Sequence, residues 1–443
     1  MKVIIIGGVA AGMSAASKII RKNPKAEITV YEKGNFLSYG ACGLPYYVGG
    51  FNEDYRKMIA RSKEQFEQMG IECCLRHEVI AVDPNRQTVT VHNSNNNQQL
   101  TKQYDRLMIA TGASPVTLSV EGWEKMGVHT LKSLEDGIFL KEYAKQQEIR
   151  NVVIVGGGYI GIECAEAFLH LGKNVRVVEA GEHILGPFDA EISALAFAEL
   201  EKQGVRVHTS EKVTRFEGDF YVRQVITNKA SYPADLVIVS VGIRPNTSFL
   251  KGSGIKLAEN GAILVNQKLE TSIPNIYAAG DCSLVYHKNT KDYRYLALGT
   301  VANKCGRIAG ANIAGGREEF IGALGSAAIK VCDLELARTG LGEKEAASGG
   351  IDYKVSLIET TDHPAYYPNP TKLTVKVIYE KKSRKILGAQ AIGEKGAVMR
   401  INIFAVAIQN EMTTEALGMT DLVYAPPFAG VWDAVQIACN AAK

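Results

Sequence analysis

Apolar runs long enough to cross a membrane are missing from this sequence of 443 residues. A spanning helix needs about 20 apolar residues in succession, whereas the apolar run that opens the chain covers only residues 3–6 before Gly7. We therefore expect this opening segment to be a β-strand rather than a signal peptide. Basic runs are missing as well, and a net charge of only +3 gives no indication of nucleic-acid binding.

Cysteine is sparse, with eight residues spread along the chain and no disulfide framework or metal-ligand spacing among them. This usage favours a reducing compartment, the cytoplasm, over a secreted protein, and we expect no metal site. Cys73 and Cys74 are adjacent, but a bond between neighbouring cysteines would be strained.

The sequence contains two copies of one nucleotide-binding pattern. The first copy is a strand at 3–6, a glycine turn at 7–12, a helix to about residue 21, and a strand at 27–31 before Glu32. The second is a strand at 152–155, a glycine turn at 156–161, a helix to about residue 171, and a strand at 175–178 before Glu179. Later strands at 107–112 and 236–242 close the two copies. This duplication predicts two Rossmann-type domains in an α/β chain.

Each glycine turn opens a helix whose free backbone N–H groups and positive dipole end suit a pyrophosphate. The carboxylate after the second strand suits ribose hydroxyls. The second turn is complete, whereas Val9 stands at the middle glycine position of the first. A later apolar strand ends in Gly280-Asp281, which is either a ligand-binding carboxylate at a strand end or a plain turn.

The remaining segments predict a helix at 296–313 with a small-residue face and, after about residue 321, an α+β module. That module has strands at 375–379 and 386–392 around a turn at 381–383, then a helix from 397 to about 410. Its apolar face suits dimerisation. We expect a discontinuous first domain at 1–112 and 244–320, a second at 113–243, and a C-terminal dimerisation domain at 321–443.

Together these features resemble the flavin- and nicotinamide-dependent pyridine nucleotide–disulfide oxidoreductases over essentially the whole chain. The resemblance implies FAD on the first Rossmann domain, NAD(P)H on the second, and a homodimer whose C-terminal domains complete the partner's sites. The residues implied to hold FAD are Gly7, Gly12, Glu32, Lys33, Thr111, Gly112 and Asp281. Those implied to hold the nicotinamide cofactor are Gly156, Gly158, Tyr159, Gly161 and Glu179, with Tyr159 shielding the flavin.

Cys42 stands alone where paired members of this family have two cysteines, since Tyr47 occupies the second position. A lone thiolate beside a flavin can cycle only by bonding an outside sulfur or by oxidation to sulfenic acid. We expect the preceding Gly40-Ala41 and the following helix start to lower its pKa.

Local differences within the single-cysteine branch favour the CoA-disulfide reductases. NADH oxidase and NADH peroxidase carry a histidine in the first glycine turn, where this chain has Ala10 and Ala11. The segment from Ser38 to Tyr46 also resembles the CoA-disulfide reductase form. The segments at 363–368 and 424–427 resemble the tyrosine pair that the second subunit lends to the site.

This resemblance implies Tyr366, or the adjacent Tyr367, together with Tyr424 as proton donors. Interface packing is the alternative for tyrosines beside prolines, and a loop or interface position is expected for His363. The residues implied to bind CoA are Lys18, Arg21, Ser38, Asn303 and Arg307. A solvated helix face remains the alternative for the charged members of this set, and Ser38 either orients the sulfur or ends a turn.

Glu179 predicts a preference for NADH over NADPH, because a carboxylate would repel a 2′-phosphate. Persulfide or polysulfide reduction, NADH oxidase or peroxidase activity, and a slowly turning redox sensor remain alternatives to the reduction of CoA disulfide.

Overall fold

The computed structural model describes residues 1–443, and its first sheet is five-stranded and parallel. The strands run in the order β18-β7-β1-β2-β3. Their bounds are β1 Lys2–Ile6, β2 Glu27–Glu32, β3 Ile71–Leu75, β7 Arg106–Ile109 and β18 Ile276–Ala278. Val3 is in register with Ile28 on one side and Arg106 on the other. The central strand is an almost continuous apolar run because both of its faces are covered.

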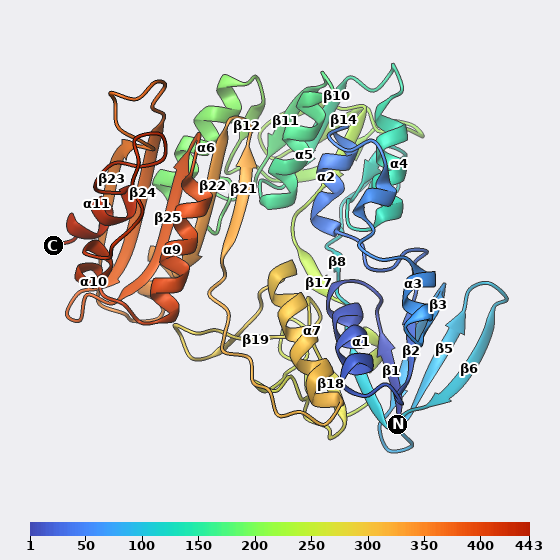
Figure 1. Cartoon of the computed structure of the whole chain (residues 1–443). Coiled ribbons are helices and arrows are strands. Elements are labelled where there is room, and N and C mark those ends of the chain that lie inside the picture. Colours follow the sequence, from blue (N-terminus) through green and yellow to red (C-terminus); the bar gives the residue numbers. More distant parts are fainter.

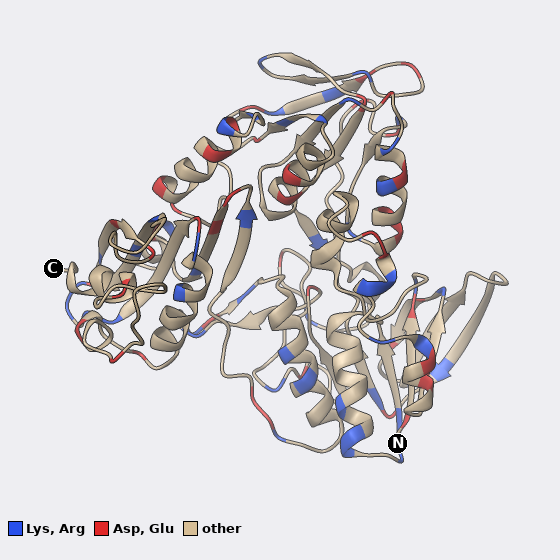
Figure 2. Cartoon of the chain, turned by 45° about the horizontal axis from the view of Figure 1, so that its top comes forward, with Lys and Arg blue, Asp and Glu red and all other residues tan.

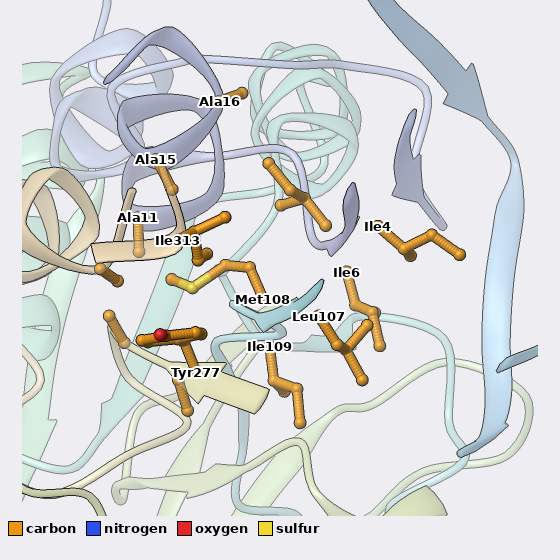
Figure 3. Close-up of a cluster of buried hydrophobic side chains, with 14 of the residues drawn as sticks. Ile4, Ile6, Ala11, Ala15, Ala16, Leu107, Met108, Ile109, Tyr277 and Ile313 are labelled. Atoms are coloured by element: carbon orange, nitrogen blue, oxygen red, sulfur yellow. The ribbon is translucent and has the colours of Figure 1, made fainter. Parts of the chain in front are cut away.

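Small residues set how closely two helices pack over this sheet. Helices α1 (Ala10–Lys22) and α7 (Gly299–Ile313) lie side by side above the apolar side chains of β7 and β18 (Figures 1 and 3). A Cβ added to Gly306 would lie 2.3 Å from the Ala11 carbonyl oxygen, and one added to Gly310 would lie 2.6 Å from that of Ala15. The two helices therefore touch backbone to backbone.

The second sheet repeats the design. It is parallel, with the order β12-β11-β10-β16-β9. The strands are β9 Val128–His129, β10 Asn151–Val155, β11 Asn174–Val178, β12 Arg206–His208 and β16 Leu236–Val239. Its helices are α4 Leu134–Ala144, α5 Tyr159–His170 and α6 Ala190–Lys202. Both expected strand–turn–helix–strand units are thus confirmed.

The two nucleotide-binding units are joined by two crossings of the chain. β8 (Ala113–Pro115) leads into the second unit, β17 (Ile243–Pro245) leads out of it, and the two pair antiparallel. Around the main sheets lie short pieces: β4 His77–Asp83, β5 Thr88–Asn93, β6 Gln98–Gln103, β13 Val213–Glu217, β14 Gln224–Thr227, β15 Ser231–Pro233, β19 Val285–Tyr286, β20 Tyr293–Arg294, α2 Leu44–Val48, α3 Lys63–Gln68 and 3₁₀ turns at Ala41–Gly43, Tyr55–Met58 and Ser248–Leu250.

The C-terminal part is an antiparallel sheet, coloured orange to red, beside the second unit (Figure 1). Its order is β21-β22-β25-β24-β23, with β21 Ala327–Val331, β22 Leu334–Gly340, β23 Tyr353–Thr361, β24 Lys372–Glu380 and β25 Ile386–Gly393. Helices α8 Glu343–Ser348, α9 Ala397–Gln409, α10 Thr414–Gly418 and α11 Ala434–Asn440 accompany it. The fully buried Lys376 ties this sheet to the second unit, since its Nζ lies 3.0 Å from Asp189 and 2.9 Å from Glu191.

Most of the expected elements agree with the structure, but the helix expected from Leu296 begins at Gly299. Leu298 has extended backbone angles and caps the helix, so the preceding apolar residues belong to the approach and not to the helix. No helix has the length and apolarity needed to cross a membrane.

Candidate functional site

Cys42 is the most accessible cysteine in the protein. It lies in the 3₁₀ turn Ala41–Gly43 that leads into α2. All eight cysteines are free thiols, but Cys42 alone is exposed, Cys74 is partly covered and the other six are buried. A dissolved substrate can therefore reach Cys42 far more readily than any other cysteine.

The thiol of Cys42 lies between the start of α2 and the start of α7. A Cβ added to Gly299, the first residue of α7, would lie 3.9 Å from the Cys42 sulfur. Helix α2, which follows the thiol, packs against α4 and α5 of the second unit. Cys42 thus occupies the junction between the two nucleotide-binding units.

The surroundings of Cys42 raise the pKa of its thiol. Although the residue as a whole is exposed, partial burial of its thiol is the largest cause, and the carboxylates of Glu163 and Asp281 add to it. Lys132 and the backbone N–H of Cys42 itself act in the opposite direction. The expected lowering by backbone N–H groups is thus present at Cys42 itself, but burial and the two carboxylates outweigh it and the pKa is raised.

Glu163 and Lys132 were not found by the sequence reasoning. Glu163 lies one turn after Tyr159 on α5, and the Tyr46 hydroxyl donates to its Oε1 at 3.4 Å. Burial raises the pKa of Glu163 to about 7. Lys132 Nζ lies 3.2 Å from Asp281 Oδ2. The i, i+4 spacing from Tyr159 could have revealed Glu163, whereas Lys132 lies outside any motif.

The first glycine turn fits a dinucleotide. Gly7 has φ +104°, and a Cβ on Gly12 would lie 1.9 Å from the Gly7 carbonyl oxygen, so both positions require glycine. Glu32 Oε2 accepts from Gly8 N at 2.7 Å, and its Oε1 accepts from Gly34 N at 2.7 Å. These bonds fix the carboxylate beside the turn, and Lys33 next to it is exposed.

The other residues expected to hold FAD gather at the same edge of the sheet. Thr111 Oγ1 donates to the Asn246 carbonyl oxygen at 2.7 Å, and Asn246 Nδ2 returns a bond to the Thr111 carbonyl oxygen at 3.0 Å. Gly112 has φ +65° and open space where a Cβ would stand. Asp281 follows β18, so these residues and the first glycine turn fit one extended ligand such as FAD.

The second turn has the same geometry. Gly156 has φ +104°, and a Cβ on Gly161 would lie 2.0 Å from the Gly156 carbonyl oxygen. Glu179 Oε2 accepts from Gly157 N and its Oε1 from Gly181 N, both at 2.6 Å. Apart from the atoms of its chain neighbours, nothing lies within 4 Å of a Cβ added to Gly158, which leaves that position free for a close ligand.

Tyr159 lies within this turn and is the first residue of α5. Its hydroxyl is buried and has no hydrogen-bond partner, its ring centroid lies 6.1 Å from that of Phe188, and burial raises its pKa to about 12. An unpaired buried hydroxyl fits a side chain that moves or gains a partner when a ligand binds.

Two tyrosine hydroxyls from distant parts of the chain form a pair on the C-terminal domain. The hydroxyls of Tyr366 and Tyr424 lie 2.8 Å apart, and the residues are 72% and 45% exposed. Tyr367 instead packs its ring on buried His363, at 5.4 Å between centroids. The structure thus brings Tyr366 to Tyr424 and leaves Tyr367 and His363 as loop-packing residues.

The candidates for CoA binding lie on one pair of helices, apart from Ser38. Lys18 and Arg21 lie on α1, while Asn303 and Arg307 are exposed on α7. Basic residues mark both neighbouring helices in Figure 2. The Lys18 ammonium lies 3.8 Å from the Glu318 carboxylate, while Arg21 Nε donates to the Ser17 carbonyl oxygen.

Ser38 has a structural place in the turn before Cys42. Its φ is +49°, its N–H donates to the Gly8 carbonyl oxygen at 2.8 Å, and its carbonyl oxygen accepts from Ala60 N at 2.8 Å. Its hydroxyl makes no hydrogen bond within the protein, so the contacts made by Ser38 are those of a residue that ends a turn.

Known proteins resemble this chain along its full length. Residues 1–306 match the family described as pyridine nucleotide-disulphide oxidoreductase, and residues 326–435 match its dimerisation domain. The NAD(P)H coenzyme A polysulfide/persulfide reductase of Pyrococcus horikoshii is 38% identical, covering 100% of this chain and 98% of the relative. The coenzyme A disulfide reductase of Staphylococcus aureus (strain COL) is 32% identical, covering 100% of both.

A solved structure shows the same architecture. The NAD-dependent persulfide reductase from A. fulgidus superposes with a TM-score of 0.96 and 36% identity. That alignment covers 99% of this chain and 82% of the other.

Proposed function

The chain belongs to the pyridine nucleotide-disulphide oxidoreductase family, and from that premise we propose that it uses electrons from NAD(P)H to reduce CoA disulfide through FAD and Cys42. The observation that carries this proposal is the solitary exposed thiol. Tyr47, at the position of the second sulfur in paired members, is buried with its ring under Lys141 Nζ at 4.5 Å. All eight cysteines are free thiols and Cys42 alone is exposed, so its disulfide partner would come from outside.

Members of this family use FAD and NAD(P)H, and the two glycine turns fit them. The first turn with Glu32, Thr111 and Asp281 would hold FAD, and the second with Glu179 would hold the nicotinamide cofactor. When bound there, FAD supplies two-electron transfer between nicotinamide and sulfur. Tyr159 lies at the start of α5, where its ring would cover the flavin until the nicotinamide enters.

Cys42 acts as the nucleophile towards CoA disulfide. Its thiolate attacks one sulfur, a Cys42–S–S–CoA bond forms, and the first CoA leaves as a thiolate. Two electrons then cleave that mixed disulfide, which restores the Cys42 thiolate and releases the second CoA. One CoA disulfide, one NAD(P)H and one proton thus give two CoA thiols and NAD(P)⁺.

The tyrosine pair supplies protons to the departing CoA thiolates. The hydrogen bond between Tyr366 and Tyr424 fixes two phenols side by side on an exposed face. That face belongs to the dimerisation domain, so the pair would act in the site of the second subunit.

We place the domain boundaries at the β8 and β17 crossings. The first domain then comprises residues 1–112 and 244–320, the second residues 113–243, and the C-terminal domain residues 321–443.

The basic face of α1 and α7 would bind the phosphates of CoA. Lys18, Arg21 and Arg307 supply charge, and exposed Asn303 supplies an amide one turn before Arg307. Helix α7 starts beside Cys42, so a CoA molecule lying along it can bring its sulfur to the thiol.

Reduction of CoA persulfide is the second candidate, because the relative from P. horikoshii shares 38% identity with this chain. The same thiolate would attack the CoA-bound sulfur of the persulfide and expel hydrosulfide in place of the first CoA. The later reduction of Cys42–S–S–CoA would be unchanged. Eight free cysteines support a reducing, cytoplasmic setting for either reaction.

The test is the intact mass of the non-reduced protein after incubation with CoA disulfide. We expect an adduct of the size of CoA that dithiothreitol removes and that Cys42→Ser lacks. Turnover with NADH is then compared for CoA disulfide, CoA persulfide and hydrogen peroxide. No adduct, together with peroxide as the best acceptor, would contradict the proposal, and a higher kcat/KM for CoA persulfide would select the second candidate.

A further inference from the structure

Two separate loops of the C-terminal domain carry the tyrosine pair. Tyr366 lies in the connection between β23 and β24, at residues 362–371, and Tyr424 lies in the segment between α10 and α11. Both tyrosines are exposed, so neither is fixed by a surrounding core. Something else must hold the loops at the separation that lets the hydroxyls meet at 2.8 Å.

Arg400 contacts both loops at once. It lies in the first turn of α9 and is only 8% exposed. Its Nη2 donates to the Asp362 carbonyl oxygen at 2.8 Å and to the Phe428 carbonyl oxygen at 3.3 Å. These carbonyls lie four residues from Tyr366 and four from Tyr424 in the chain.

The guanidinium of Arg400 is itself held rigidly. Its Nε and Nη2 each lie 2.9 Å from Asp433 Oδ2, and Asp433 caps α11 by accepting from Val435 N at 2.9 Å. Such a planar, charge-assisted contact fixes orientation as well as distance.

The loop that carries Tyr366 is closed by hydrogen bonds at Asp362, the residue that Arg400 contacts. Asp362 Oδ1 accepts from Thr371 N at 2.6 Å, and the Thr371 carbonyl oxygen accepts from Asp362 N at 3.0 Å. Buried His363 fills the interior and contacts the Pro368 carbonyl oxygen at 3.2 Å. The loop therefore moves as a unit, and displacement of Asp362 displaces Tyr366.

We propose that Arg400 is a positioning residue that holds both loops so that Tyr366 and Tyr424 meet. The proposal rests on the role of the phenols given above. Arg400 itself touches neither hydroxyl, and it acts through the two backbone carbonyls. A lysine at this position would keep one charge beside Asp433 but lacks the fork that reaches all three partners.

The test compares Arg400→Lys with Arg384→Lys in the full-length, FAD-loaded protein. Arg384 is a matched control, because it lies in the same domain and makes similar bonds to Thr414 Oγ1 and the Ala442 carbonyl oxygen, away from both loops. Amide hydrogen exchange is measured by mass spectrometry for the segments 362–371 and 421–432. We expect exchange in both segments to rise together, about tenfold or more, in Arg400→Lys only.

Kinetics supply the second readout. Arg400→Lys should lower kcat/KM for CoA disulfide about tenfold, while the rate of flavin reduction by NADH stays within about twofold. Tyr366→Phe is then introduced into the parent protein and into Arg400→Lys. If Arg400 acts through the pair, the loss caused by Tyr366→Phe shrinks in the Arg400→Lys background.

Unchanged exchange in the two loops would overturn the proposal, and so would a clear loss of turnover on Tyr366→Phe that is equally large in the parent and in Arg400→Lys. A third outcome separates this proposal from the function. If Tyr366→Phe leaves turnover intact while Arg400→Lys still loosens both loops, the proton-donor role of the phenols fails and positioning by Arg400 stands.

Discussion

Because Glu163 is largely buried, its protonation makes the free energy of unfolding depend on pH. Its pKa is about 7 in the folded protein against 4.5 for an unperturbed glutamate. Between these values the folded protein holds a proton that the unfolded chain has released. The free energy of unfolding therefore falls as the pH rises from 4.5 to 7, and the contribution from this proton is lost above that window.

Glu163→Gln should remove this dependence. We expect the variant, relative to the parent, to gain about 2 to 3 kcal/mol in the free energy of unfolding between pH 4.5 and pH 8. Urea denaturation of the FAD-loaded protein across that range measures the difference. Glu182→Gln, at an exposed carboxylate of the same nucleotide-binding unit, is the control. Parallel pH profiles for the parent and Glu163→Gln would contradict the assignment.

Glu179 predicts the choice of nicotinamide cofactor. Both of its oxygens are fixed by backbone N–H groups of the second turn region, so the carboxylate cannot easily swing away from a 2′-phosphate. We expect kcat/KM for NADH to exceed that for NADPH by about tenfold or more, and Glu179→Ala to narrow the ratio. Equal use of the two cofactors by the parent enzyme would refute this prediction.

Single residues show where sequence reasoning reaches its limit. The glycines and acids of both turns could be located because backbone geometry demands those residue types at fixed offsets. Tyr366 and Tyr367 could not be separated, since the choice depends on which ring packs on His363 within a folded loop. The raised pKa of Cys42 escaped the sequence for a similar reason, because burial, its largest cause, and the carboxylates of Glu163 and Asp281 arise only in the folded chain.

At the scale of elements, the contact between α1 and α7 depends on glycine. Gly306→Ala would place a methyl group 2.3 Å from the Ala11 carbonyl oxygen, so the helices must separate. We expect a loss of about 1 to 3 kcal/mol in stability and weaker retention of FAD, because Ala11 lies in the first glycine turn.

Thermal unfolding and the flavin content after gel filtration measure both effects of Gly306→Ala. Gly186→Ala is the control, since no atom lies within 4 Å of the added methyl group, and its stability should stay within about 0.5 kcal/mol of the parent. A Gly306→Ala protein that unfolds and retains FAD like the control would show that the helices tolerate separation.

The periodicity of the sequence predicted the parallel strands and their helices well, because continuous apolar runs and glycine turns are local signals. The start of α7 was missed by three residues. Apolar Leu296 and Leu298 continue the helical pattern, although their backbone leads into the helix rather than forming part of it.

The contact between the C-terminal sheet and the second unit joins residues that are distant in the chain, and no local sequence pattern predicts it. In the sequence, Lys376 lies within an apolar strand segment and shows no sign of a special role. In the structure it is fully buried among carboxylates from the start of α6 and from α8. A buried lysine is stable only when such partners surround it. Those partners lie far away in sequence, so only the folded chain reveals them.

The assembly of two chains decides whether the tyrosine pair acts in its own subunit or in the other. Tyr366 and Tyr424 are exposed on the chain, on the domain that matches the family's dimerisation domain. If each chain lends them to its partner, a heterodimer of Cys42→Ser with Tyr366→Phe/Tyr424→Phe contains one intact site. It combines the thiol of one chain with the phenols of the other.

We expect such a heterodimer, purified through two different tags, to recover about half of the parental activity per dimer, since one of two symmetry-related sites is restored. The Cys42→Ser homodimer has no Cys42 thiol in either site, and the double tyrosine homodimer has no phenol pair in either site. The activities of these two homodimers are the baselines for the heterodimer. CoA disulfide turnover with NADH is the measurement. Activity no higher than the mean of the two homodimers would place the phenols in the same chain as the thiol they serve.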